Sequence, residues 1–385
     1  MKRISLFILL LLCVCLLAAV SPPYFKKQVE VLIDGEALAG DCLRVEVSHA
    51  IKAKRAGGFE KLYDALLKKY SPKEALNYLA IGLGDYLSAE CERRKVDPLD
   101  ATLEWTKNIS APFIYYDERA GREASLVEVG RQVARALDEG DNSRALCYTR
   151  KVAAEVTAKD LKQNTGEIAR FSTAFATSGK NRRHNLALAA KAISGTVLLP
   201  GESFSFNGAV GERTAERGFR EANIVVNGEF KKGVGGGVCQ VSTTLYNAVL
   251  LAALPVENAA AHSIPVSYVQ PSRDCTVSAA IDFRFKNDTS HPLYIAAEIK
   301  DSTLTFVLFG ERRGEPCRLE SEVTERIPYR NVYEDGTEAT PEGALLLSPG
   351  REGIKSRLYL IRGATRTLIR ENYYAGKNAV YKKAA

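Results

Sequence analysis

A single cysteine stands where a glycine-rich run meets a segment that becomes almost wholly apolar. The run GVGGGV ends at Val238, Cys239 follows, and the apolar character grows toward Leu254. This pattern predicts a loop followed by a buried helix that begins near Cys239. Unpaired N–H groups and the helix dipole at such a terminus favour a thiolate, and the same N–H groups can hold a developing oxyanion. Cys239 is therefore a candidate nucleophile.

A nucleophilic cysteine also needs a general base, and often a group that orients the base. His262 is the first histidine after the predicted helix, and it opens a run, HSIPVSYV, that reads as a strand. Around the next predicted strand, CTVSAAIDFRF, the alternation places Asp274 and Asp282 opposite the apolar side chains, so either one could orient His262. The order of helix-start Cys, strand His and strand Asp is also used by papain-like and transglutaminase-like enzymes, a likeness at the level of fold alone.

Other interpretations of the glycine run and the thiol stay open. GVGGGV lacks the lysine of a P-loop and carries Val238 where a dinucleotide-binding motif has its last glycine, so nucleotide binding is not expected. Glycines can serve close packing alone, and a free cysteine often acts as a small buried hydrophobe. Cys275, on the apolar face of its predicted strand, is assigned to the core.

The remaining cysteines point to no metal or cofactor. Six cysteines follow the N-terminal segment, far apart and without a C-x-x-C pair. This spacing does not predict a zinc site, and it leaves the disulfide status open. We expect no metal and no cofactor.

The chemistry-bearing residues lie in a region, 168–310, that is predicted to be α+β. A helix ending at Gly195, two short strands about a Pro200-Gly201 turn, and a hairpin with Asn227-Gly228 in its two-residue turn precede the glycine run. The glycine loop and its helix come next, and antiparallel strands follow.

Two further regions flank this one. Residues 28–165 read as a small α+β domain, in which Ser71, Pro72 and Glu74 form the start signal of a helix. Residues 328–385 read as a short strand-rich tail. The expected fold class is therefore α+β throughout.

The N-terminus predicts contact with a membrane. Lys2 and Arg3 precede an apolar stretch, 4–20, in which only Ser5 is polar. We interpret residues 1–23 as a signal anchor or transmembrane helix, and favour an uncleaved, single-pass anchor in the cell membrane with the bulk of the chain outside. The net charge of +7 comes without dense basic blocks between aromatics, so nucleic acid is not an expected partner. The oligomeric state is left open.

Three stretches make the region around Cys239 recognisable. They are NRRHNLALAAKAISGTVLLPGESFSFNGAVGERTAERGF, GGGVCQVSTTLYNAVLLAAL and HSIPVSYVQPSRDCTV, and over about residues 172–295 they closely resemble the VanW family. The preceding region, with FIYYDERAG and VGRQVARALDEGD, is similar to the peptidoglycan-binding (YoaR-like) domain that often comes before it. The tail is faintly similar to G5-type extensions.

The resemblance implies a bacterial cell-envelope protein whose partner is peptidoglycan or its precursors, and it supplies no reaction. It also marks motif positions, which we take as candidate substrate-binding residues: Gly235, Gly236, Gly237, Gln240, Ser242, Thr243 and Tyr246. For Tyr246, packing in the core is the alternative.

Two functions follow. The first is a membrane-anchored wall-binding or accessory factor. The alternative is a cysteine-dependent enzyme, with Cys239, His262 and Asp274 or Asp282, that acts on peptide or amide bonds of wall material. A Cys239 thiol within hydrogen-bond reach of the His262 ring would favour the enzyme. A thiol sealed in apolar surroundings would indicate that Cys239 is only a core residue.

Overall fold

The computed structural model describes residues 25–38, 43–47, 50–140, 142–226, 229–339, 341–342 and 344–382. The predicted anchor, 1–23, and the Asn227-Gly228 turn lie outside the described residues. Within the described ranges, no helix has the length and apolar character needed to cross a membrane. The protein is mixed α+β with mainly antiparallel sheets, which confirms this part of the predicted fold class.

The chain forms two compact units. The first comprises Met1–Thr102 and Asp117–Thr157, and the second comprises Leu103–Tyr116 and Ala158–Ala385. The boundaries predicted from the sequence (28–165, 168–310 and 328–385) divide the chain differently and stay predictions. In the structure the tail packs within the second unit, together with the glycine loop and its helix.

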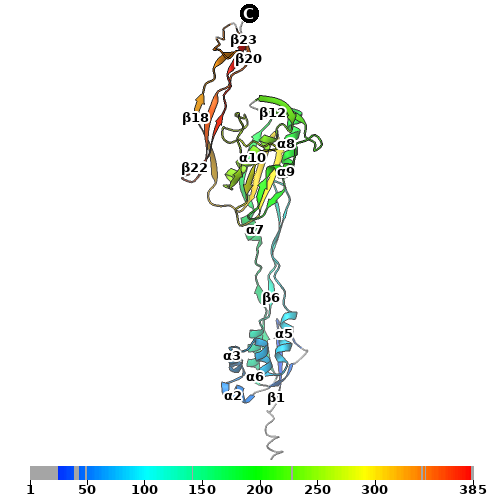
Figure 1. The fold of residues 1–385 in the computed structure, drawn as a ribbon. Helices are drawn as coiled ribbons and strands as arrows, with labels where there is room; N and C mark the ends of the chain where they lie inside the picture. The colour runs from blue at the N-terminus through cyan, green and yellow to red at the C-terminus, as the bar shows by residue number, and fades with distance from the viewer. Residues whose placement is uncertain are drawn as a thin grey trace, which may run out of the picture. The chain divides into compact units, whose positions relative to one another are not determined.

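The first unit combines helices with a small sheet (Figure 1). Its helices are α2 (Ala50–Ala56), α3 (Phe59–Leu66), α4 (Pro72–Leu79), α5 (Leu83–Arg93) and α6 (Leu126–Glu139). Its strands are β1 (Phe25–Ile33), β2 (Glu36–Ala37), β3 (Leu43–Val47), β6 (Gly121–Glu123), β7 (Ser143–Cys147) and β8 (Arg150–Val152). The start predicted for α4 is confirmed, because Ser71 and Glu74 form a reciprocal capping box before Pro72.

The second unit is built around a four-stranded antiparallel sheet in the order β10-β16-β17-β9. The elements up to the glycine loop are β4 (Thr102–Trp105), β5 (Phe113–Tyr116), α7 (Ala158–Asn164), β9 (Gly166–Ala174), α8 (Lys180–Ile193), β10 (Thr196–Leu198), β11 (Ser203–Ser205), α9 (Phe206–Val210), β12 (Glu221–Val226) and β13 (Glu229–Val234). Those after it are α10 (Val238–Leu251), β14 (Val256–Asn258), β15 (Arg284–Lys286), β16 (Leu293–Lys300) and β17 (Thr303–Gly310). The tail adds β18 (Cys317–Ile327), β19 (Asn331–Tyr333), β20 (Leu345–Ser348), β21 (Gly353–Arg362), β22 (Thr365–Tyr374) and β23 (Ala379–Lys382).

Helix α10 is the centre of this unit and packs against β9, β17 and α8 (Figure 1). Nearly all of its residues are buried, including Leu245 and Val249 at 0% exposure, so burial of its apolar surface dominates its stability. The helix begins after Gly237, whose φ of 108° lies in the left-handed region that favours glycine. A Cβ at Gly236 would lie 2.6 Å from the Asn223 carbonyl oxygen, so this position also excludes a side chain.

The strands predicted at 262–269 and 275–285 are mostly wrong. Of this part of the chain only β15 and a single bridge between Ala260 and Thr276 have strand pairing. The physical reason is that side chains of α10 take the place of a neighbouring strand: the Cys275 N–H donates to Thr243 Oγ1 at 2.9 Å, and its carbonyl accepts from Ser242 Oγ at 2.6 Å. The segment from 259 to 283 is therefore an ordered loop against the helix.

Candidate active site

Cys239 lies at the second residue of α10, where the helix meets the glycine loop, as the sequence predicts. Its side chain is partly buried. The sulfur lies 3.4 Å from the Val277 carbonyl oxygen and 3.6 Å from the Thr276 hydroxyl. Since the first N–H groups of a helix have no partner within it, the Cys239 N–H is positioned to stabilise negative charge beside the thiol.

His262 and Asp274 form the second part of the site. The His262 ring nitrogen Nδ1 lies 2.7 Å from Asp274 Oδ2, and the His262 backbone N–H donates to the same oxygen at 2.6 Å. Both side chains are buried, with Asp274 only 1% exposed. Because Nδ1 is committed to the carboxylate, Nε2 is the ring nitrogen left for the thiol of Cys239, and the two groups are near enough to shift each other's pKa.

The three groups shift one another's ionisation. Burial opposes the charged thiolate, but the hydrogen bond and positive charge of His262 outweigh it and hold the pKa of Cys239 below its ordinary value. Burial also opposes the imidazolium, yet the bonds to Asp274 and Cys239 raise the pKa of His262 to about 9. Burial disfavours the carboxylate as well, but the bonds from His262 and Tyr374 keep the pKa of Asp274 low. The imidazolium and the carboxylate are therefore favoured near neutral pH, and the Cys239 thiol is shifted toward its thiolate form.

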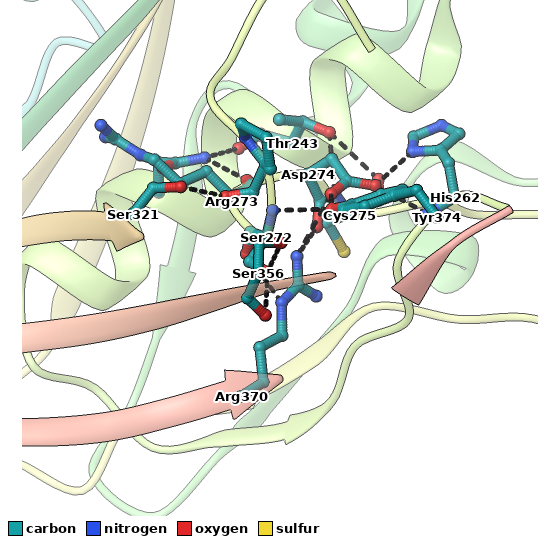
Figure 2. Close-up of polar contacts among 12 residues, drawn as sticks. Thr243, His262, Ser272, Arg273, Asp274, Cys275, Ser321, Ser356, Arg370 and Tyr374 are labelled. Atoms are coloured by element: carbon teal, nitrogen blue, oxygen red, sulfur yellow. Dashed lines mark hydrogen bonds and ion pairs between the residues drawn. The ribbon is translucent and has the colours of Figure 1, made fainter. Parts of the chain in front are cut away.

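The tail holds Asp274 in place (Figure 2). The Tyr374 hydroxyl, at the end of β22, donates to Asp274 Oδ1 and accepts the Ser272 N–H at 2.6 Å. From the same strand, Arg370 donates to the carbonyls of Ser272 and Asp274, and its Nη2 lies 3.5 Å from Asp274 Oδ1. Tyr374 is fully buried, so this support is shielded from water.

Polar residues of α10 hold the other side of the same segment. Ser242 and Thr243 bind the Cys275 backbone, and Asn247 Nδ2 donates to the Arg273 carbonyl at 2.8 Å. All three side chains are 0% exposed. The helix that presents Cys239 thus also fixes the loop that presents Asp274.

The thiol and imidazole open into a cleft of about 1270 Å³ within the second unit. Its lining includes Cys239, His262, Gln240 and the glycine loop, 235–237. Gln240 contributes little polarity to the cleft, because its amide donates to Thr173 Oγ1 and the Ala174 carbonyl.

The structure brings together Cys239, His262 and Asp274, but not Asp282. The Asp282 carboxylate binds Ser205 Oγ at 2.6 Å and the Asn207 N–H at 2.8 Å, so it caps the start of α9 instead of orienting His262. Asp274 and not Asp282 is the partner of the histidine.

Three candidate substrate-binding residues lie in the core. Ser242, Thr243 and Tyr246 are at most 1% exposed and are not among the residues that line the cleft. Tyr246 packs edge-on against Phe283, with ring centroids 5.6 Å apart. Cys275 is also fully buried, as predicted, and burial raises the pKa of its thiol.

Sequence reasoning missed Tyr374 and Arg370. The run TRTLIRENYY predicts a strand, which is confirmed as β22, but nothing in that pattern connects it to Asp274. No group of three or more His, Cys, Asp or Glu side chains suited to a metal ion occurs among the residues that the structure describes.

The chain is similar to known proteins over the region that contains Cys239, His262 and Asp274. Residues 181–309 match the protein-family model described as VanW like protein. The chain is 44% identical over 161 residues to the uncharacterized protein YoaR of Bacillus subtilis, a match covering 42% of this chain and 52% of YoaR. It is 26% identical over 177 residues to the vancomycin B-type resistance protein VanW of Enterococcus faecalis, covering 44% of this chain and 64% of that protein.

The matches thus span between half and two thirds of each relative's length. Among solved structures, the crystal structure of HP0197-G5 aligns over 18% of this chain and all of its own, at 19% identity and a TM-score of 0.12, which is too low to carry an argument. The matched region contains the thiol, the histidine and the carboxylate described above, and over residues 181–309 the chain is similar to the VanW family.

Proposed function

We propose that the chain is a cysteine-dependent enzyme that cleaves or exchanges peptide or amide bonds of bacterial cell-wall material. One observation carries the proposal: Cys239 at a helix N-terminus lies beside His262, which is hydrogen-bonded to Asp274, and the thiol and the imidazole line one cleft. A structural cysteine needs neither the imidazole nor the opening.

In the proposed reaction, the Cys239 thiolate attacks the carbonyl carbon of the scissile amide. The negative charge that develops on the carbonyl oxygen faces the Cys239 N–H at the start of α10. The C–N bond then breaks, and the leaving amine takes the proton from the His262 imidazolium. The resulting thioester is attacked by water or by a second amine, whose proton passes to His262, and this step releases the acyl group from sulfur. Asp274 keeps the imidazole oriented throughout.

The wall as the place of action is part of the proposal. It is supported by the similarity to a vancomycin-resistance protein and by the apolar N-terminal segment, 4–20, which would anchor the chain with its bulk outside the membrane. Protease added to intact cells that express the chain should then digest its folded units. Full protection of the chain would contradict an outside location.

To test the proposed enzymatic activity, the full-length chain is incubated with purified peptidoglycan. The products are separated and identified by mass spectrometry. We expect new muropeptides with the wild type and none with Cys239→Ala. A Cys317→Ala variant is the matched control, because Cys317 is a partly buried thiol on β18. Binding is measured in parallel by sedimentation with the wall material.

If the wild type and Cys239→Ala both sediment with the wall material to the same extent and neither changes the wall peptides, the proposed enzymatic activity is contradicted. The same result would support the wall-binding or accessory function instead. If only the wild type and Cys317→Ala change the peptides, the thiol carries the activity.

A further inference from the structure

Two arginine side chains lie over the glycine loop immediately before Cys239. A Cβ at Gly237 would lie 2.9 Å from Arg182 Cγ, and a Cβ at Gly235 would lie 2.9 Å from Arg213 Cβ. Arg182 comes from α8, and Arg213 comes from the loop after α9. Because the two glycines have no side chain, two arginine side chains can lie beside the thiol.

Both guanidinium groups are held by neutral partners. Arg182 donates to Ser178 Oγ at 2.6 Å and to Gln240 Oε1 at 2.7 Å. Arg213 donates to Asn207 Oδ1 at 2.6 Å. In the described ranges, neither forms an ion pair with a carboxylate, and a guanidinium has more N–H donors than these contacts use.

The two arginines lie in the cleft without a paired carboxylate among the described residues. Both line the cleft and both are about half buried, so each has lost part of its hydration. Burial lowers the pKa of both groups, the negative charge of Cys239 opposes this shift in both, and the charge of Asp282 opposes it in Arg213. The only carboxylate in the described lining is that of Glu212, which is exposed. The cleft beside the thiol thus holds more positive than negative charge.

We propose that Arg182 and Arg213 form a subsite for a carboxylate of the substrate. The inference rests on the proposed thiol chemistry and narrows its substrate class to peptides that carry a free carboxylate close to the bond attacked by Cys239. The planar guanidinium, with paired N–H donors, suits a carboxylate better than a point charge would. Desolvation in the cleft strengthens that interaction.

The alternative is that the arginines only stabilise the thiolate. Two alkylating reagents separate these roles, because both react with the thiolate and differ in charge. We would measure the labelling rate of Cys239 in the full-length chain with iodoacetate and with iodoacetamide, by peptide mass spectrometry. Both rates depend on the same fraction of Cys239 in the thiolate form, so this fraction drops out of their ratio. The ratio therefore reports only how strongly the site attracts the carboxylate of iodoacetate.

We expect the iodoacetate-to-iodoacetamide ratio at Cys239 to exceed that of the same cysteine in the urea-unfolded chain by about tenfold. Arg182→Gln and Arg213→Gln should each lower the ratio by roughly threefold or more. Arg220→Gln is the matched control, since its side chain is exposed and does not line the cleft, and it should leave the ratio unchanged.

A measurement on the wild type keeps the test valid if a variant does not fold. N-acetylglycine should slow the labelling of Cys239 by iodoacetamide, and N-acetylglycinamide at the same concentration should not. Equal protection by both, or a native ratio equal to the unfolded one, would overturn the subsite and leave the thiol chemistry standing. Failure of both reagents to label Cys239 in the folded chain would overturn the subsite and the proposed function together.

Discussion

The replacement Tyr374→Phe tests whether the tail is part of the site. The lost hydroxyl donates to Asp274 and accepts the Ser272 N–H at 2.6 Å, all in buried surroundings. A hydrogen bond to a charged group contributes about 1.5–3 kcal/mol, and a buried N–H left without a partner costs a similar amount. Because the two losses share one atom and the site can relax, we expect the free energy of unfolding to fall by about 2–3 kcal/mol.

The stability of the second unit can be followed separately. The chain has one tryptophan, Trp105, and it packs within that unit against Tyr294 and Phe309. Urea unfolding followed by tryptophan fluorescence therefore reports on the unit that contains the site. Tyr373→Phe is the matched control, since this neighbouring tyrosine is 57% exposed and should change stability by less than about 0.5 kcal/mol.

The same variant should affect the chemistry. With Oδ1 of Asp274 released, the carboxylate holds the imidazole less firmly, and the labelling of Cys239 by iodoacetamide near pH 7 should slow by about twofold to tenfold. Asp274→Asn, which removes the negative charge beside His262, should slow the labelling of Cys239 more than Tyr374→Phe does. If Tyr374→Phe matches Tyr373→Phe in both measurements, the tail only adjoins the site and the reasoning is refuted.

Three further predictions concern the thiol and its loop. Iodoacetamide should label Cys239 much faster than Cys275 in the folded protein, because burial raises the pKa of the second thiol, and equal, slow labelling would show that both are core residues. The labelling of Cys239 should persist below the usual thiol pKa of about 8.5, and His262→Ala should shift this pH profile upward. Bond cleavage that needs the His262 imidazolium should decline as the pH passes about 9. Gly236→Ala puts a Cβ 2.6 Å from the Asn223 carbonyl oxygen, so the midpoint of the tryptophan-monitored unfolding should fall by an amount equivalent to about 1–3 kcal/mol, and an unchanged midpoint would contradict the packing argument.

Local patterns predicted much of the fold. The capping box at Ser71 and Glu74, the helix that begins next to Cys239, at Val238, and the paired strands β16 and β17 all follow from signals within a few residues. Cys239 and His262 could also be proposed as a pair, since the helix terminus and the scarcity of histidines limit the choice.

The choice of carboxylate and its support could not be predicted locally. Alternation treated Asp274 and Asp282 alike, because the segment was read as a strand, whereas the hydroxyls of Ser242 and Thr243 turn it into a loop against α10. The signal that distinguishes the two carboxylates lies in tertiary contacts, and only Asp274 receives Tyr374.

The contact between Tyr374 and Asp274 joins residues 100 positions apart. During synthesis, a growing chain already contains the thiol, the imidazole and the carboxylate long before residue 374 is added. Closing so long a loop costs entropy and is expected to come late in folding. The nucleophile would therefore be present early, but its orienting carboxylate would be secured only after β22 has docked. An unfinished chain would then react through Cys239 more slowly than the completed one.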